Sequence, residues 1–349
     1  MPVCRRLRNN RKQGDGGTIL DEADDSRTIL EIHGLKVCYR AEGEIVQAVD
    51  GVDLRVTAGE AFGIIGESGS GKSTLAAAIL RLLPPEAEVL SGSMRFEGRD
   101  VLSAGENEML KIRGARMALV PQDPATSLNP VIRIGTQISE VLRAHSKLKR
   151  SERTDRVLEL LQDVGFPDPS KVASAYTHEL SGGQRQRVVI AKAVACEPAL
   201  VIADEPTSKL DSSLQNEILE LMWKLVQQNH GALILITHDP AILAGFASRI
   251  AVMYAGRIVE EGLADDVLRR PLHPYTQALL RLLPAGQQQR TKTTKLPMIP
   301  GEPPDLTQTG PGCRFAPRCP DRMPVCANED PGESTPNLWH RVSCVKYVH

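Results

Sequence analysis

A nine-residue stretch, GESGSGKST (residues 66–74), constrains the fold of this chain more than any other part of its sequence. It fits the pattern G-x-x-x-x-G-K-[ST] and lies between an apolar run, AFGII (61–65), and a run of strong helix formers, KSTLAAAILRLL (72–83), which Pro84 and Pro85 halt. A strand, a glycine-rich turn and a helix in this order predict the first unit of an α/β fold. A glycine-rich turn with an accidental lysine is the alternative, and this context disfavours it.

The residue types in this stretch are those that a polyphosphate needs. Its glycines allow backbone N–H groups to turn inward at the N-terminus of the helix, where the helix dipole also favours an anion. Lys72 is expected to reach the outer phosphates, and the Ser73 hydroxyl is expected to bind Mg²⁺. The predicted phosphate-binding residues are Gly66, Ser68, Gly69, Gly71, Lys72, Ser73 and Thr74.

A second motif, LVIADEP (200–206), is an apolar run that ends in two adjacent acids. Acids that follow a strand are often solvated turn residues, so this motif is weak when it stands alone. Beside a phosphate loop it predicts that Asp204 holds Mg²⁺ and that Glu205 orients or deprotonates the attacking water.

A third motif, LSGGQRQR (180–187), places two adjacent glycines directly before a helical run. Its exposed amides and the helix dipole predict another anion site, with a glycine pair of the helix-capping type as the alternative. Two such sites exceed what one triphosphate needs from a single face, so we expect this one to contact the γ-phosphate of a nucleotide held by another chain. The residues predicted for this contact are Ser181, Gly182, Gly183 and Gln184.

Composition narrows the function classes. The 42 basic residues nearly balance the 43 acidic ones, and aromatic residues make up only 3%, so nucleic acid is not the expected partner. The sequence contains no apolar run near the roughly 18–20 residues that span a bilayer. The start of the chain is basic without the apolar stretch of a signal peptide, so we expect residues 1–28 to be a disordered extension and export to be absent.

The remaining patterns predict where strands and helices lie. Short β-type runs occupy 29–56, helical periodicity dominates about 125–196, and buried-type strands recur at 199–203 and 232–237. In SERTDRVLELLQDVGF, Val157, Leu160, Leu161 and Val164 share one helical face. Further predicted elements are a helix over roughly 213–229, a hairpin at 250–262, a last helix at 273–283 and a polar linker at 286–296.

The end of the chain differs from the rest. Residues 301–336 carry eight prolines and no sustained periodicity, so this segment is not expected to fold unaided. Seven cysteines without a secretion signal favour thiols or metal ligands over a disulfide framework.

The order of the motifs resembles that of the ATPase subunit of an ABC transporter. GESGSGKST, LSGGQ and LVIADEP are similar to the Walker A, signature and Walker B segments of that family, over about residues 29–265. The resemblance implies an α/β P-loop NTPase core with an antiparallel β subdomain and a helical subdomain at about 125–196. A small Cys- and Pro-rich extension would follow at 266–349.

The same resemblance assigns four further residues. It places Gln122 in the Q-loop, where it would bind Mg²⁺ with Ser73 and Asp204 and sense the membrane partner. It identifies His238 as the switch histidine that contacts the γ-phosphate. The implied catalytic residues are then His238, Lys72 and Glu205. Tyr39 would stack on adenine, and Asp211 would lie in the D-loop. Taken singly, a histidine after a strand or a tyrosine in one is more often a surface or packing residue.

Two positions depart from the family pattern. Lys209 stands in the D-loop where a small residue is usual, and Ser248 stands where an aspartate usually precedes the arginine. Neither change removes a catalytic group, although Lys209 places a cation near the expected dimer interface.

The cysteines of the tail, with HPYTQALL upstream, resemble the dipeptide/oligopeptide importer branch of the family. That resemblance implies that Cys313, Cys319, Cys326 and Cys344 hold a [4Fe–4S] cluster. Their spacing is wider than that of common zinc sites, and four thiolates in a segment without a core suit a metal that stabilises the fold. Zinc and metal-free thiols remain alternatives.

The implied function is an ATP- and Mg²⁺-dependent subunit that energises peptide import. Its implied partners are a second ABC ATPase, more often a related chain than a copy, two transmembrane permease subunits and, indirectly, an extracytoplasmic substrate-binding protein. Its implied place is the cytoplasmic face of a bacterial inner membrane. The alternatives are an importer of nickel or another small solute, a soluble ABC ATPase without a permease, and a redox-responsive binding module with vestigial hydrolysis.

Overall fold

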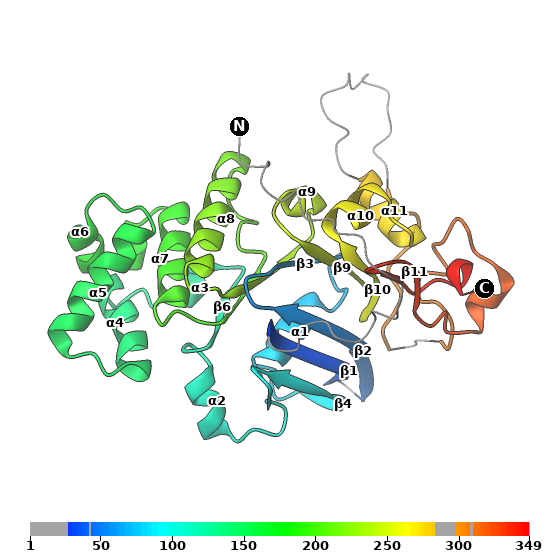
Figure 1. The fold of residues 1–349 in the computed structure, drawn as a ribbon, viewed down its shortest axis with the longest axis horizontal. Coiled ribbons are helices and arrows are strands. Elements are labelled where there is room, and N and C mark those ends of the chain that lie inside the picture. Colours follow the sequence, from blue (N-terminus) through cyan, green and yellow to red (C-terminus); the bar gives the residue numbers. More distant parts are fainter. Residues whose placement is uncertain (1–26, 42, 283–297, 308–309, 349) are drawn as a thin grey trace, which may run out of the picture.

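A computed structural model describes residues 27–41, 43–282, 298–307 and 310–348. Two sheets meet in the middle of the molecule, and helices lie around the larger one (Figure 1). Of the extension expected at residues 1–28, residues 1–26 lie outside the described residues, and Thr28 is already the first residue of a strand. The linker expected at 286–296 also lies outside the described residues. No helix in the described ranges is both long enough and apolar enough to span a membrane.

The larger sheet has eight strands in the order β11-β12-β10-β9-β3-β8-β7-β6. Its parallel part consists of β9 (Arg249–Tyr254), β3 (Ala61–Ile65), β8 (Ala232–Thr237), β7 (Leu200–Asp204) and β6 (Met117–Val120). Every residue of β3 and β8 is buried, and alternate residues of β8 pack into the two cores on opposite faces of the sheet. Burial on both faces explains why these strands are continuous apolar runs in the sequence.

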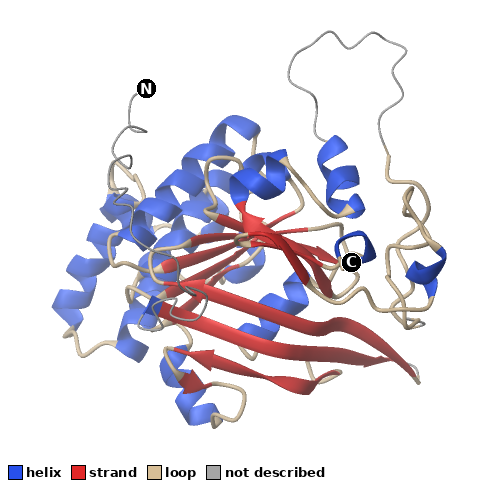
Figure 2. Cartoon of the chain, turned by 45° about the vertical axis from the view of Figure 1, so that its right-hand side comes forward, coloured by secondary structure: helices blue, strands red, loops and turns tan. Residues whose placement is uncertain are grey.

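The smaller sheet is antiparallel and has the order β2-β1-β4-β5. Its strands are β1 (Thr28–Ala41), β2 (Glu44–Thr57), β4 (Ala87–Phe96) and β5 (Arg99–Asp100). Figure 2 shows the long strands of this sheet lying across the molecule below the parallel core. The alternating runs at 29–56 therefore form strands, as their pattern predicts.

A group of helices lies beyond the edge strand β6, on the left of Figure 1. Val157, Leu160, Leu161 and Val164 are buried together, which confirms the predicted apolar face. The helices of this part and of the segment leading to it are α2 (Glu106–Ile112), α3 (Pro124–Ser127), α4 (Ile134–His145), α5 (Arg150–Asp163), α6 (Pro169–Ser174), η2 (Thr177–Glu179) and α7 (Gly182–Val194).

The helix after the phosphate loop is shorter than its sequence suggests. The helix formers predict a helix to residue 83, but α1 (Lys72–Ile79) ends four residues earlier, and Arg81 adopts a positive φ of 51°. The chain leaves the helix before it reaches the prolines. The other helices of the core are α8 (Ser212–Gln227), α9 (Pro240–Leu243), α10 (Ala264–Arg269) and α11 (Pro274–Arg281).

The C-terminal tail, residues 298–307 and 310–348, joins the larger sheet. Strand β12 (His340–Val342) pairs with β10 (Arg257–Leu263), and β11 (Ser334–Asn337) pairs with β12. The remaining turns of the tail are η3 (Pro324–Ala327) and η4 (Val345–Tyr347). The tail is thus ordered by backbone pairing with the rest of the chain, which its sequence pattern does not indicate.

The sequence His273-Pro274-Tyr275 starts α11. Burial lowers the pKa of His273 to about 4, so its ring is neutral at physiological pH and Nδ1 accepts a 3.0 Å hydrogen bond from the Tyr275 N–H. Pro274 occupies the first helical turn, where a missing N–H costs nothing. The Tyr275 ring is thereby held in the core, with its centroid 4.4 Å from that of the Tyr254 ring and the two rings tilted by 50°.

Candidate nucleotide site

The phosphate loop lies between β3 and α1, where its motif predicts. A Cβ at Gly66 would stand 2.1 Å from the Met253 carbonyl oxygen, and one at Gly71 would stand 2.1 Å from the Ala48 carbonyl oxygen. Gly71 also has a φ of 101°, which side chains rarely adopt. Only glycine allows the loop to pass this close to its neighbours and then turn into the helix.

Lys72 is buried beneath the loop. Its ammonium donates 2.8 Å hydrogen bonds to the carbonyl oxygens of Gly66 and Glu67 and a 3.2 Å bond to Ser70 Oγ. Desolvation lowers the pKa of Lys72, while the charges of Glu205, Asp204 and Glu67 raise it. The cation is therefore held at the loop by several acceptors that a phosphate oxygen is able to replace.

Asp204 ends strand β7 and bonds to Ser73. Burial raises the pKa of Asp204, with Glu205 adding to the effect and with Ser73 and Lys72 opposing it. Its Oδ1 atom is buried and has no hydrogen-bond partner among the described residues. A hard cation prefers oxygen ligands, so an unpaired carboxylate oxygen beside a hydroxyl fits Mg²⁺.

Glu205 is where three separate segments meet. Gln122 Nε2 donates to its Oε2 at 3.0 Å, and His238 Nδ1 lies 3.0 Å from its Oε1. Glu205 has a positive φ of 45°, an uncommon conformation for a side chain of this size, and its N–H donates to the Ile236 carbonyl. The turn after β7 aims the carboxylate between the Q-loop glutamine and the histidine after β8.

Most of these residues line one cavity of about 720 Å³, but Gly66 and Asp204 are not among its lining residues. Within it, Tyr39 Oη lies 3.3 Å from Thr74 Oγ1, which joins β1 to the start of α1. The cavity contains the predicted phosphate-loop residues Ser68, Gly69, Gly71, Lys72, Ser73 and Thr74 together with Tyr39, Gln122, Glu205 and His238. Its other lining residues are Val46, Ala48, Ser70 and Leu306.

Leu306 is one of four lining residues that the sequence does not predict for the site, the others being Val46, Ala48 and Ser70. It comes from the proline-rich tail, and no motif marks it. Val46 and Ala48 belong to strand β2, and the pattern around them predicts only a strand. A contact that forms between distant segments leaves no local pattern in either of them.

The signature residues lie apart from this cavity. Ser181 caps α7, since its Oγ accepts from the Gln184 N–H at 3.3 Å while Gln184 Oε1 accepts from the Ser181 N–H at 2.9 Å. Gly182 is exposed, and a Cβ at Gly183 would stand 2.6 Å from Leu214 Cδ2. None of these four residues lines the cavity, so a nucleotide in it does not meet the signature of the same chain.

The D-loop precedes α8, and Asp211 is exposed at the helix cap. The unusual Lys209 forms a 2.5 Å ion pair with Asp123, the residue after Gln122. The D-loop and Q-loop are thus joined within one chain. At the other departure, Ser248 Oγ donates to the Ala61 carbonyl at 3.0 Å.

The four cysteines of the tail converge. Cys313, Cys319, Cys326 and Cys344 line one cavity of about 20 Å³, which is room for little more than one water molecule. Burial, followed by the charges of Cys344 and Cys326, raises the pKa of Cys313 to about 11, and burial also raises the pKa of Cys319 and Cys344. In the described part of the chain, the cysteines are free thiols.

The arrangement of these thiols can be compared with the geometry that a single metal ion or an iron–sulfur cluster needs. Among the described residues, no group of three His, Cys, Asp or Glu side chains is placed to hold a single metal ion. A tetrahedral zinc would need its sulfur atoms within about 4 Å of one another. Four convergent thiols are the donor set of an iron–sulfur cluster.

Two protein families match the chain. The family described as ABC transporter matches residues 49–208, which contain the phosphate loop, Gln122, the signature and Glu205. The family described as oligopeptide/dipeptide transporter, C-terminal region, matches residues 259–326, which contain α11 and three of the four tail cysteines.

Individual relatives match over nearly the whole chain. The oligopeptide transport ATP-binding protein AppD of Bacillus subtilis (strain 168) is 43% identical over 321 residues, covering 92% of this chain and 97% of that protein. The dipeptide transport ATP-binding protein DppD of the same organism is 43% identical over 317 residues, covering 90% of this chain and 94% of that protein.

A solved structure has a similar fold. The ATP-binding cassette MJ0796, in a dimeric post-hydrolysis state bound to ADP and Pi, matches with a TM-score of 0.61 and 29% identity. The match covers 68% of this chain and 99% of that one, so about a third of this chain has no counterpart there.

Proposed function

Because the chain belongs to the ABC transporter family of ATP-binding ATPase subunits, we propose that it hydrolyses ATP to drive the import of dipeptides or oligopeptides. The observation that carries the peptide assignment is the tail. The match to the oligopeptide/dipeptide C-terminal region begins in β10 and runs through the helix and turns that pack on the nucleotide cavity. The two named relatives are called oligopeptide and dipeptide transport proteins, and their similarity covers 92% and 90% of this chain, far more than residues 49–208 alone.

The residues of the cavity have these proposed roles. Lys72 and the loop amides hold the β- and γ-phosphates, while Ser73, Asp204 and Gln122 hold Mg²⁺, which neutralises developing charge on the phosphates. Glu205 orients the attacking water and accepts its proton, and His238 contacts the γ-phosphate. Tyr39 stacks on the adenine. The hydrogen bonds from Gln122 and His238 to Glu205 support this arrangement, since they set the direction of the carboxylate.

A second ATPase subunit completes the proposed site. Ser181, Gly182, Gly183 and Gln184 lie at the exposed N-terminus of α7, outside the cavity of their own chain. Their amides and the helix dipole suit the γ-phosphate of a nucleotide in the partner, and Asp211 lies beside the same interface. The partner is proposed to be a related chain. Two permease subunits and an extracytoplasmic binding protein complete the transporter.

The division of the chain and its location follow from this assembly. The ATPase domain is proposed to span 29–265, with its helical subdomain at about 125–196, and the extension to span 266–349. The subunit is proposed to be a peripheral protein at the cytoplasmic face of a bacterial membrane.

The proposed solute is tested by uptake. In the source bacterium with this gene deleted, the chain should restore uptake of a labelled dipeptide or oligopeptide, and the Lys72→Ala variant should not, because that variant lacks the phosphate-binding cation. Labelled Ni²⁺ uptake is measured in the same cells. Restoration of nickel uptake without peptide uptake would contradict the peptide assignment and favour a small-solute importer.

The tail cysteines are proposed to hold a [4Fe–4S] cluster, and this is supported by the convergence of four thiols from separate turns. When bound, such a cluster joins the turns that carry the four thiols and stabilises their fold. Anaerobically purified protein should therefore contain about four iron and four sulfide per chain and absorb in the visible range.

Replacing Cys319 and Cys326 with serine should remove the iron, because a hydroxyl is a poor substitute for a thiolate ligand. The matched control is Cys196→Ser, which changes a half-buried cysteine outside the tail and should keep the parent iron content. Zinc is assayed in all samples. Equal iron in the double variant and the parent would contradict the proposed cluster at these cysteines. Stoichiometric zinc without iron would show that the tail binds zinc instead.

A further inference from the structure

Glu67, the second residue of the phosphate loop, forms hydrogen bonds through its N–H, its carboxylate and its carbonyl oxygen. Its N–H donates to Tyr275 Oη at 2.8 Å, and its carboxylate accepts from Arg318 at 2.7 and 3.1 Å. Its carbonyl oxygen accepts from Lys72 at 2.8 Å. Two of the three contacts therefore come from outside the phosphate loop and the other nucleotide-site motifs, namely from α11 and from the tail.

Arg318 is built into its position. Its side chain is only 4% exposed, and besides Glu67 it donates to the Pro300 carbonyl at 3.0 Å and to Tyr254 Oη at 3.3 Å. The guanidinium also lies 5.8 Å from the centre of the Tyr254 ring. A two-pronged contact from a planar guanidinium fixes the direction of the carboxylate as well as its distance.

An aromatic cluster supports Arg318 from behind. The rings of Tyr254, Tyr275 and Phe315 pack against one another, with centroids 4.4 to 5.4 Å apart. Phe315 lies in the same turn as Arg318, whose N–H donates to the Phe315 carbonyl at 2.9 Å. The aromatic cluster thus joins α11, strand β9 and the tail directly behind the phosphate loop.

A second arginine of this turn anchors it on the other side. Arg314 donates to Asp50 Oδ2 at 2.6 Å and to Gln47 Oε1 at 3.2 Å, both on strand β2, and also to the Ala255 carbonyl. The turn between Cys313 and Cys319 is therefore fixed both to the antiparallel sheet and to the phosphate loop.

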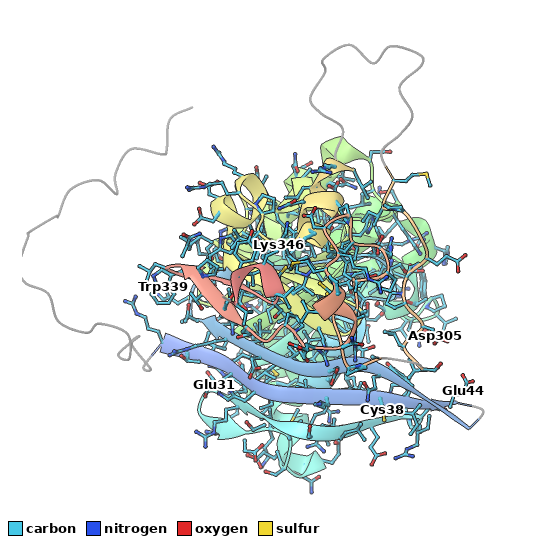
Figure 3. All side chains as sticks on the ribbon, turned by 90° about the vertical axis from the view of Figure 1, so that its right-hand side faces the viewer. Glu31, Cys38, Glu44, Asp305, Trp339 and Lys346 are labelled. Atoms are coloured by element: carbon cyan, nitrogen blue, oxygen red, sulfur yellow. The ribbon has the colours of Figure 1, made fainter. Side chains whose placement is uncertain are left out.

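The same part of the tail reaches the nucleotide cavity itself. Pro303, Pro304 and Leu306 line a small pocket with loop residues 67–70, and the Gln47 N–H donates to the Leu306 carbonyl at 3.2 Å. Leu306 then forms part of the wall that carries Tyr39. In Figure 3 the tail, with Lys346 and Trp339 marked on it, lies above the strands β1 and β2, and Asp305 marks the stretch that leads to Leu306.

We propose that the tail is a working part of the nucleotide site, in which Arg318, through Glu67, holds the phosphate loop in its binding conformation. Arg318 is a positioning residue, since it touches the loop and not the nucleotide. A loop that is held in place before the nucleotide arrives loses less conformational freedom on binding, so the contact between Arg318 and Glu67 raises the affinity for the nucleotide. This inference rests on the proposed ATP binding and assigns to the tail a role in it.

The test is MgADP affinity of the full chain by isothermal titration calorimetry, because ADP contacts the loop without being hydrolysed. Arg318→Ala should raise the dissociation constant by about 10-fold or more, as expected for loss of a charge-assisted, two-pronged hydrogen bond. Arg318→Lys should lie between the parent and Arg318→Ala, because it keeps the charge and loses the fork. Tyr275→Phe, which removes one hydroxyl and keeps the ring, should weaken binding by roughly 3-fold or more.

A double-mutant cycle separates positioning from general destabilisation. If Arg318 acts through Glu67, adding Arg318→Ala to a Glu67→Ala chain should change the dissociation constant by less than about 2-fold. The matched control is Arg341→Ala, another tail arginine, which pairs with Glu261 and Glu333 away from the cavity and should bind MgADP as the parent does. Iron content and the thermal midpoint are measured for each variant.

The outcomes are distinct. A parent chain that does not bind MgADP would reject the proposed function. A parent that binds, with Arg318→Ala and Tyr275→Phe binding equally well, would overturn the positioning role alone. An equal loss of affinity in the presence and absence of Glu67 would also overturn it, since the effect would then not pass through the loop. If Arg318→Ala does not fold, Arg318→Lys and Tyr275→Phe decide the question.

Discussion

Replacement of Glu205 with glutamine is expected to lower the rate of ATP hydrolysis by ~10²–10⁴-fold, the usual contribution of a general base. Glutamine has nearly the same shape as glutamate and keeps one oxygen that accepts a hydrogen bond, so the side chain still fits between Gln122 and His238. It cannot accept the proton of the attacking water. Binding of ATP should be unchanged, because the positive charge and the amides that hold the phosphates remain.

The measurement is steady-state phosphate release together with ATP affinity and size-exclusion chromatography with MgATP. Bound ATP that is not hydrolysed should keep the variant in a closed dimer with its partner subunit, while the parent returns to the open state. The matched control is Glu159→Gln on α5, an exposed glutamate that pairs with Arg156 outside the cavity and should hydrolyse ATP at the parent rate. Loss of ATP binding in Glu205→Gln would contradict the assigned role, as would undiminished hydrolysis.

Replacement of Lys72 with alanine is expected to weaken MgATP binding by ~100-fold or more. Each hydrogen bond from a charged donor contributes up to ~3 kcal/mol, and every 1.4 kcal/mol is a factor of ten in affinity. Lys72 already lies at the loop, bonded to the carbonyl oxygens of Gly66 and Glu67, so little rearrangement is needed for it to meet a phosphate.

The fold should tolerate this change, because desolvation already disfavours the buried cation, as its lowered pKa indicates. Thermal unfolding checks that the variant is folded, and calorimetry gives the affinity. Lys171→Ala, an exposed lysine on α6, is the matched control and should bind MgATP normally. Unchanged affinity in Lys72→Ala would reject the phosphate loop as the nucleotide site.

The two variants are informative together because they separate binding from chemistry. Lys72→Ala should lose binding and hydrolysis in parallel, whereas Glu205→Gln should lose hydrolysis alone. The opposite pattern would require the roles of the two residues to be exchanged.

The sequence by itself determined the local parts of this protein. The phosphate loop could be recognised because its chemistry needs particular residues at adjacent backbone positions, and only glycine permits the approach of the loop to the Met253 and Ala48 carbonyls. The buried strands could be recognised because both of their faces are covered, which makes them continuous apolar runs.

Residues that act through distant partners could be assigned only by resemblance or not at all. Nothing in the local sequence of Gln122 or His238 predicts that both meet Glu205, since the three lie at the ends of different elements. Helix propensity also predicts too long a helix after the phosphate loop, because α1 ends at Ile79 although helix-forming residues continue to residue 83.

Only the tertiary structure decided the place of the tail. Its prolines and its lack of periodicity predict a segment that cannot fold alone. In the structure β12 pairs with β10, and Arg318 contacts Glu67, which lies 251 residues earlier in the sequence. Such contacts depend on which surfaces the fold brings together, and a single arginine or leucine in a proline-rich stretch carries no sign of them. The sequence determines what each segment can do, and the packing of distant segments decides which of them act at one site.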